Sequence, residues 1–322
     1  MIRLPVPWGN VVGIARTILA LALMVTVLGS STTTLFRPVG GLGEYPLCEG
    51  IARVGVFCLV GNDNLGIARA VCAILLAVVA SGWRPRFTAI PLAWIALSVS
   101  TGIAIPEGGD QIAGNLAILL AVVGITDGRR WHWEISDRDP EGTVGRIMTL
   151  AGVCAYCLAK LQISVLYLQA SLAKLPHAEW ADGTAVYYWL HHPVFGVTAW
   201  SAFIASAVVD VPLLVAGLTW GTVAIEFALA LVLLLPRLAR LWIMGLGAAL
   251  HLGIGLTLGL WSFSIAMLAA LLVLVPPVGA SVRVRRRVPE QGEETAVTPR
   301  REAQRDAESE LLAVSQMGSM GR

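Results

Sequence analysis

The chain has 322 residues, of which 56% are hydrophobic and 14% are charged, and its formal net charge at pH 7 is +2. Soluble globular domains carry about 25% charged residues, so this composition excludes a soluble enzyme or a soluble binding module. The small net charge gives no reason to expect a nucleic-acid partner. The expected fold class is all-α, a polytopic bundle of transmembrane helices in the cell membrane.

Eight apolar segments are candidates for membrane-spanning helices, which need about 20 residues each. They are 11–29, 64–82, 87–105, 111–126, 146–173, 219–235, 239–257 and 259–275. We expect the first to be a retained span, because no small-residue cleavage site follows it.

Arginines follow the alternation that eight spans require. The connections at 83–87, 127–146, 236–240 and 282–287 are rich in arginine, whereas the connections between them carry few basic residues. Cytoplasmic loops carry the excess of Lys and Arg, so this pattern predicts that both termini are cytoplasmic.

Two segments need separate treatment. Residues 197–218 are apolar enough for a ninth span, but Asp210 and Pro212 interrupt them, and a ninth crossing would break the arginine alternation. We prefer a re-entrant or surface-lying helix there. The predicted domains are a transmembrane domain at 1–280 and a disordered cytoplasmic tail at 281–322, since the tail is polar and poor in apolar residues.

Cys48 and Cys58 lie in the first outer connection. That side of the membrane is oxidising, so we predict a disulfide between them.

The fifth apolar segment carries an unusual polar stripe. At about 100° per residue, Lys160, Tyr167, Ser171 and Lys174 fall within roughly 60° of one another. Such a stripe must face protein or a water-filled cavity. Lys174 could instead snorkel to the headgroups from the end of its span, whereas Lys160 lies about 20 Å further in, at 1.5 Å per residue.

Two further ionisable groups, Glu226 and His251, lie within the sixth and seventh spans. With the two lysines they suggest a shared polar centre. A lysine in a water-poor pocket can lose its proton and act as a general base, and a histidine can shuttle protons. The alternative is a set of buried structural pairs. We find no metal-ligand spacing and expect no metal.

The outer segment 176–193 is aromatic and acidic, and includes Trp180, Asp182 and Gly183. It suits an interfacial aromatic belt. The alternative is a cap over a cavity whose floor holds Lys174.

The residues at 167–185 follow the pattern Y-x-x-A-x-x-x-K-L-x-x-x-x-W-x-x-G-T-A. Three more pieces come in order: GGDQ, TWGTVAIEFALALVLLLPR with Glu226, and ALHLGIGLTLGLWSFSIAML with His251. Over about 11–278 this set resembles the HTTM superfamily, the membrane domain of vitamin K-dependent γ-glutamyl carboxylases and their bacterial relatives. The first loop, SGWRPRF and RRWHW are similar to the SdpB-like branch, which is associated with maturation of sporulation-delaying-type peptide toxins.

The resemblance implies roles for the candidate residues. Lys174 matches the lysine regarded in the carboxylases as the base that deprotonates vitamin K hydroquinone, so a membrane quinol is the implied cofactor. Glu226 and His251 would then orient the cofactor or tune the lysine. The contacts that would bind the cofactor or shape its cap are Lys160, Tyr167, Trp180, Asp182 and Gly183.

The chain also departs from the carboxylases. Ala173 stands where their signature has a second lysine, and we expect no large extracytoplasmic domain after the spans. These departures argue against carboxylation of a protein substrate. They leave a quinol-linked modification of a peptide, or another step in its maturation.

Two functions are therefore open. The first is maturation of a secreted, toxin-like antimicrobial peptide, with Lys174, His251 and Glu226 as catalytic groups. The second is a non-enzymatic role, in which the protein binds or transports a peptide or lipid, or serves as a partner subunit. Both imply contact with membrane lipid.

Overall fold

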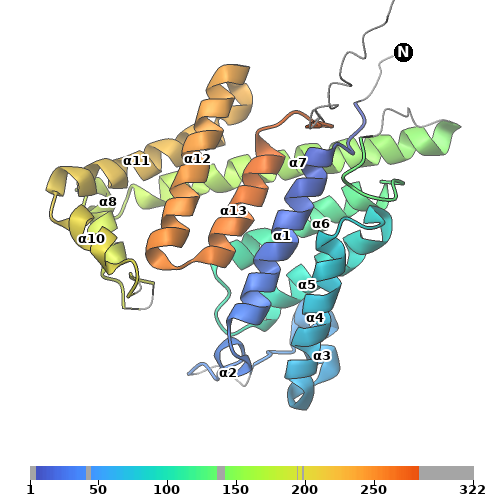
Figure 1. Cartoon of the computed structure of the whole chain (residues 1–322), viewed down its shortest axis with the longest axis horizontal. Coiled ribbons are helices and arrows are strands. Elements are labelled where there is room, and N and C mark those ends of the chain that lie inside the picture. Colours follow the sequence, from blue (N-terminus) through green and yellow to red (C-terminus); the bar gives the residue numbers. More distant parts are fainter. Residues whose placement is uncertain (1–4, 41–44, 136–141, 194, 198, 283–322) are drawn as a thin grey trace, which may run out of the picture. The chain divides into compact units, whose positions relative to one another are not determined.

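The computed structural model describes residues 5–40, 45–135, 142–193, 195–197 and 199–282, which fold into a bundle of helices (Figure 1). The longer helices are α1 (Asn10–Gly29), α4 (Leu65–Ala80), α5 (Pro85–Gly102), α6 (Gly108–Ile125), α7 (Gly142–Lys174), α11 (Pro212–Ala230), α12 (Arg237–Leu258) and α13 (Trp261–Leu274). The shorter ones are α2 (Thr32–Leu35), α3 (Val56–Val60), α8 (Ala178–Ala181), α9 (Ala185–Leu190) and α10 (Ala202–Val209), with the 3-10 turns η1 (Gly50–Val54), η2 (Asn62–Asn64) and η3 (Val232–Leu234).

Among the described residues, six helical segments are long and apolar enough to cross a membrane: α1, Asn62–Ser81, α6, α7, α11 and α12. The other two predicted spans, 87–105 and 259–275, coincide with the helices α5 and α13. The prediction of an all-α membrane bundle is confirmed. Of the predicted tail, 281–322, residues 283–322 lie outside the described residues, so the tail and its boundary stay predictions.

Both bounds of the predicted sixth span, 219–235, were wrong. The helix α11 begins seven residues before that span, at Pro212, and stops five residues short of its end, at Ala230. Residues 197–218 are therefore not one re-entrant or surface helix. They divide at Asp210 into α10 and the first turns of α11. Proline suits the first turn of a helix, where its missing N–H leaves no bond unmade, and this local preference decides where the helix starts.

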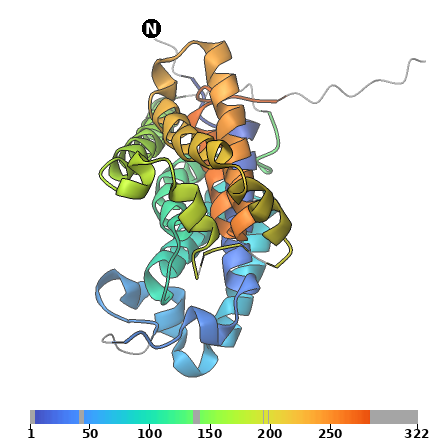
Figure 2. The ribbon, with the colours of Figure 1, turned by 90° about the vertical axis from the view of Figure 1, so that its left-hand side faces the viewer.

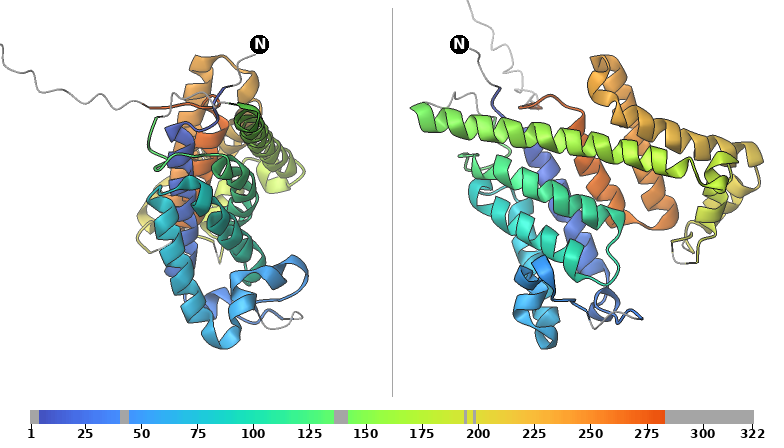
Figure 3. Two further views of the ribbon diagram at one scale, coloured as in Figure 1. Left: turned by 90° about the vertical axis from the view of Figure 1, so that its right-hand side faces the viewer. Right: turned by 180° about the vertical axis from the view of Figure 1, so that it is seen from behind.

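The helix α1 lies at the centre of one half of the bundle, where it packs against α4, α6 and α13. The helix α13 also contacts α7 and α12, so it joins that half to the group formed by α7, α11 and α12. Figure 3 shows that α7 crosses α1 and α13 at a steep angle rather than running alongside them. This crossing carries the C-terminal end of α7 to α11 and to the short helices α8 and α9.

Connections that the arginine pattern assigns to one side are bonded to each other. Residues 81–84 and 129–133 meet through a bridge between Trp83 and Trp131, and Asn10 bonds the backbone of Val282. At the opposite end of the bundle, Ala104 donates its backbone N–H to Leu35. Figure 2 shows the first loop, with α2 and α3, at the end of the bundle away from the start of α1. The alternation of sides predicted from the sequence is thus compatible with the contacts.

The first loop, which follows α1, is closed by a disulfide between Cys48 and Cys58, with Cα atoms 5.6 Å apart. The loop is also bonded to α5, because the indole N–H of Trp94 on that helix donates to the carbonyl of Val54 at 2.7 Å. Ser98, one turn further along α5, accepts the backbone N–H of Val56 at 2.9 Å.

Candidate functional site

The helix α7 presents its polar stripe to the protein. Its buried residues recur every three or four positions and include Tyr156, Lys160, Tyr167 and Ser171. The opposite face is apolar and exposed, with Leu158, Leu161, Val165 and Leu172 among its residues. This spacing follows the 3.6-residue period of a helix, and it places the predicted polar groups against α11, α12 and α13.

Lys174 ends α7 and forms an ion pair with Glu226 of α11. Its Nζ atom lies 2.6 Å and 2.9 Å from the two carboxylate oxygens, and 3.1 Å from the carbonyl oxygen of Ala170. The lysine side chain is 21% exposed and the glutamate side chain 12% exposed. The pair is therefore mostly withdrawn from water, and the three N–H donors of the ammonium each have an acceptor.

Trp180 completes the surroundings of the lysine. Its ring centroid lies 5.2 Å from the Nζ atom of Lys174, within the range of a cation–π contact. Trp180 belongs to α8, and Gly183 follows that helix with a positive φ of 77°. A Cβ atom at Gly183 would lie 3.3–3.5 Å from atoms of Ala216 and Trp220, so the cap segment turns tightly there against α11.

Next to this ion pair, the hydroxyl of Tyr167 and Nε2 of His251 on α12 are 2.9 Å apart. Both side chains are fully buried. The Nδ1 atom of His251 is also buried, and no group in the described part of the chain bonds it. Tyr167 lies two helical turns before Lys174 on α7, and the partners of these two residues lie on α12 and α11. The four side chains therefore form two bonded pairs along one face of α7.

Lys160 is not brought to this group. It is buried, and its Nζ atom donates to the carbonyl oxygens of Leu274 at 2.6 Å and Pro276 at 2.5 Å. Leu274 ends α13 and Pro276 follows two residues later, so neither carbonyl has a partner within the helix. A cation at a helix C-terminus is favoured by the helix dipole, so the geometry gives Lys160 a local structural role.

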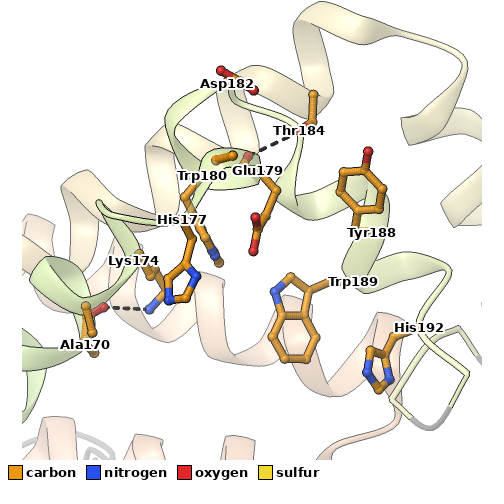
Figure 4. Close-up of a pocket in the computed structure, with 12 residues that line it drawn as sticks. Ala170, Lys174, His177, Glu179, Trp180, Asp182, Thr184, Tyr188, Trp189 and His192 are labelled. Carbon is orange, nitrogen blue, oxygen red and sulfur yellow. Dashed lines mark hydrogen bonds between the residues drawn. The ribbon is translucent and has the colours of Figure 1, made fainter.

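A pocket of about 840 Å³ opens beside Lys174 (Figure 4). The segment 176–193, predicted as a cap, supplies most of its wall. The lining residues are Ala170, Ala173, Lys174, His177, Ala178, Glu179, Trp180, Asp182, Thr184, Tyr188, Trp189 and His192. Volumes of 300–1,000 Å³ are usual for small-molecule sites. No group of three or more His, Cys, Asp or Glu side chains within the described ranges is placed to hold a metal ion.

The sequence reasoning singled out Lys174, Trp180 and Asp182 of this lining, and missed His177 and Glu179. These two residues sit in a short loop and a single-turn helix, where no periodicity indicates which way a side chain points. Their place within the aromatic and acidic segment next to Lys174 was the only signal available.

A separate polar cluster lies where α6 begins. Asp110 is buried and accepts a hydrogen bond from Thr26 at 2.7 Å, and it also caps the backbone N–H of Glu107. The Glu107 carboxylate in turn accepts a hydrogen bond from Ser262 of α13. Burial, with the neighbouring charge of Asp110, raises the pKa of Glu107 from 4.5 to about 7, against the opposing effect of a backbone hydrogen bond from Phe263.

This raised pKa predicts a pH-dependent stability. Folding favours protonated Glu107. The contribution of this residue to the stability of the fold is therefore fully present below about pH 4.5 and is lost as the pH rises through about 7. We expect a lower melting temperature at pH 8 than at pH 5 in neutral detergent, and a smaller difference for Glu107→Gln. Glu49→Gln, at an exposed position of the first loop, is the control. An unchanged pH dependence in Glu107→Gln would contradict this assignment.

Two curated proteins of Bacillus subtilis (strain 168) are similar to this chain over most of its length. The uncharacterized protein YitO is 32% identical over 279 residues, which are 86% of this chain and 88% of the relative. The sporulation-delaying protein SdpB is 31% identical over 281 residues, which are 86% of this chain and 84% of the relative. The chain belongs to the SdpB family.

The predicted SdpB-like branch is therefore confirmed. The long apolar helices identify the chain as a membrane protein. No family model matches the chain, so its membership of the wider HTTM superfamily stays a prediction. No solved structure matches it either.

Proposed function

We propose that this SdpB-family protein is a multi-pass protein of the cell membrane that acts in the maturation of a secreted, toxin-like peptide. In this proposal, Lys174 and Glu226 transfer the proton that the reaction requires. The observation that carries it is their ion pair, whose lysine lines a pocket walled by the aromatic segment 176–193. The relationship to a protein named as sporulation-delaying supports the choice of a secreted peptide as the substrate.

The pair can hold one proton on either side. With the proton on Lys174 it is an ammonium and a carboxylate, and with the proton on Glu226 it is a neutral amine and a neutral acid. In the second form, the lone pair on Nζ can accept a proton from an acidic O–H or N–H group in the pocket. The pair then carries one positive charge beside the substrate anion, so charge is balanced locally and water is largely excluded.

Tyr167 and His251 would support this step as positioning residues. Tyr167 lies two turns before Lys174 on α7, and its hydrogen bond with His251 fixes the histidine ring. The buried Nδ1 atom of His251 has no bond from the described residues. It is therefore a buried polar atom that is able to take a further partner, such as a ligand hydroxyl or a water molecule.

The residues of the pocket suit a quinol headgroup. Trp180 and Tyr188 offer ring faces for an aromatic ligand, and the Nζ atom of Lys174 lies where it can contact a ring hydroxyl. When bound, a membrane quinol would supply an acidic hydroxyl proton and two electrons. The chain would stack the ring, orient its hydroxyl toward Lys174 and hold the proton on the ion pair.

The alternative is a non-enzymatic membrane protein that binds a peptide or lipid and passes it to a partner subunit. The complete set of acceptors around Lys174 favours this alternative, because a fully bonded ammonium is also what a structural ion pair presents.

Mass spectrometry of extracellular peptides, from a host with the gene and from the same host without it, tests the proposal. We expect a peptide that differs in mass between the two cultures, and the difference identifies the reaction. Equal masses with reduced export would favour the binding role. Identical peptides in identical amounts would contradict both.

A further inference from the structure

The pocket contains a carboxylate that the ion pair does not use. Glu179 lies on α8, where its backbone carbonyl accepts hydrogen bonds from the backbone and side chain of Thr184. Its carboxylate points into the pocket, toward Trp189 (Figure 4). No side chain in the described ranges donates a hydrogen bond to it. The local backbone is thus fixed, while the charged group is left facing the cavity.

The charges of the pocket make this carboxylate attractive to a cation. The charge of Lys174 is offset by Glu226 at 2.6 Å, so the remaining charged lining groups are the acids Glu179 and Asp182. Asp182 points away from the cavity in Figure 4. Glu179 is therefore the carboxylate that a ligand in this part of the pocket would meet.

Aromatic rings surround the same space. Trp189 stacks on His192 with ring centroids 5.7 Å apart, and His192 stacks on Phe195 at 5.3 Å, which fixes the wall opposite Glu179. Another ring of the pocket, Trp180, already receives an ammonium group, since Lys174 lies 5.2 Å from its centroid. A carboxylate beside indole and phenol rings is the combination that binds organic cations.

We propose that Glu179 and the ring of Trp189 bind a cationic side chain, lysine or arginine, of the peptide substrate. This rests on the proposed function, because it names the substrate feature that the same pocket would hold. A site for a neutral aromatic ligand would not need a carboxylate, and a carboxylate that only stabilised the fold would be hydrogen-bonded. Glu179 lies at an aromatic wall, and no side chain in the described ranges bonds its carboxylate, so the geometry points to a cation.

The test uses the purified full-length protein in neutral detergent and two probe peptides, acetyl-Gly-Gly-Lys-Gly-Gly-amide and its norleucine counterpart. Norleucine has a similar length but no charge. We expect the lysine peptide to bind the wild type about tenfold more tightly, the value of one charge-assisted contact. Glu179→Gln should remove this preference, and Asp182→Asn, on the same rim but pointing away, should keep it.

Glycerophosphoethanolamine, added as a competitor, separates the two sources of an ammonium group. If it displaces the lysine peptide at lower concentration than free peptide does, the site is for a lipid headgroup and the proposal is overturned. Equal affinity of the two peptides for the wild type also overturns it, and this comparison does not depend on whether any variant folds. A preference retained by folded Glu179→Gln overturns the role of Glu179.

Failure of the proposed cation site is distinguishable from failure of the proposed maturation function. Lys174→Arg leaves Glu179 and Trp189 in place, so it should keep the preference for the lysine peptide even where peptide maturation is lost. Retained maturation with no peptide preference would reject the cation site alone.

Discussion

Lys174→Met is expected to lower the free energy of unfolding by about 3–5 kcal/mol, because it leaves the charge of Glu226 unpaired and largely withdrawn from water. The methionine keeps the length of the lysine stem, so lost packing contributes little. Glu226→Leu should be milder, since Lys174 is the more exposed partner, at 21% against 12%, and can turn into the open pocket. The double variant should regain most of the lost stability, since no charge is left unpaired.

Thermal denaturation of the four proteins in one neutral detergent gives the double-mutant cycle. Lys174→Arg serves as the matched control, because arginine keeps the charge and can bond both carboxylate oxygens. A Lys174→Met protein as stable as the wild type would contradict the buried ion pair described here.

Lys174→Arg is expected to leave the protein folded in the membrane and to reduce peptide maturation by about 10²–10⁴-fold, the usual contribution of a general base. The guanidinium keeps the ion pair with Glu226, but it does not lose its proton in proteins. The readout is the amount of matured peptide in the medium, divided by the amount of the protein in membranes.

A binding or transport role predicts the opposite result. A charge that only holds a ligand or the helix pair is retained by arginine, so the peptide yield should change little. Maturation at wild-type level in Lys174→Arg would therefore remove the base from the mechanism and favour the non-enzymatic alternative.

Local signals in the sequence predicted much of the fold. Hydropathy marked each of the long helices, and the spacing of Lys160, Tyr167 and Ser171 predicted that their face of α7 turns inward, as their burial shows. Both properties depend on residues within one helix. The start of α11 was missed because residues 197–218 were treated as one helix separate from the sixth span, although Asp210 and Pro212 interrupt them. Pro212 in fact begins the helix that continues into that span.

The partners of the polar residues depend on how helices pack, which one helix cannot indicate. Glu226 was an expected partner for a lysine, but nothing in the sequence decided between Lys160 and Lys174. The structure pairs it with Lys174 because α7 crosses the bundle and meets α11 at its end. Lys160 instead bonds two backbone carbonyls. Every residue carries a carbonyl, so residue types in the sequence cannot identify this kind of partner.

The measurement that tests the central claim most directly uses the peptide that accumulates in the medium of the Lys174→Arg host. This peptide is purified and incubated with membranes containing the wild-type protein, with membranes containing Lys174→Arg, and with membranes lacking both. We predict that only the wild-type membranes change its mass, and that the new mass equals that of the peptide secreted by the wild-type host. A peptide left unchanged by wild-type membranes, or changed equally by Lys174→Arg membranes, would contradict a role for Lys174 as the base.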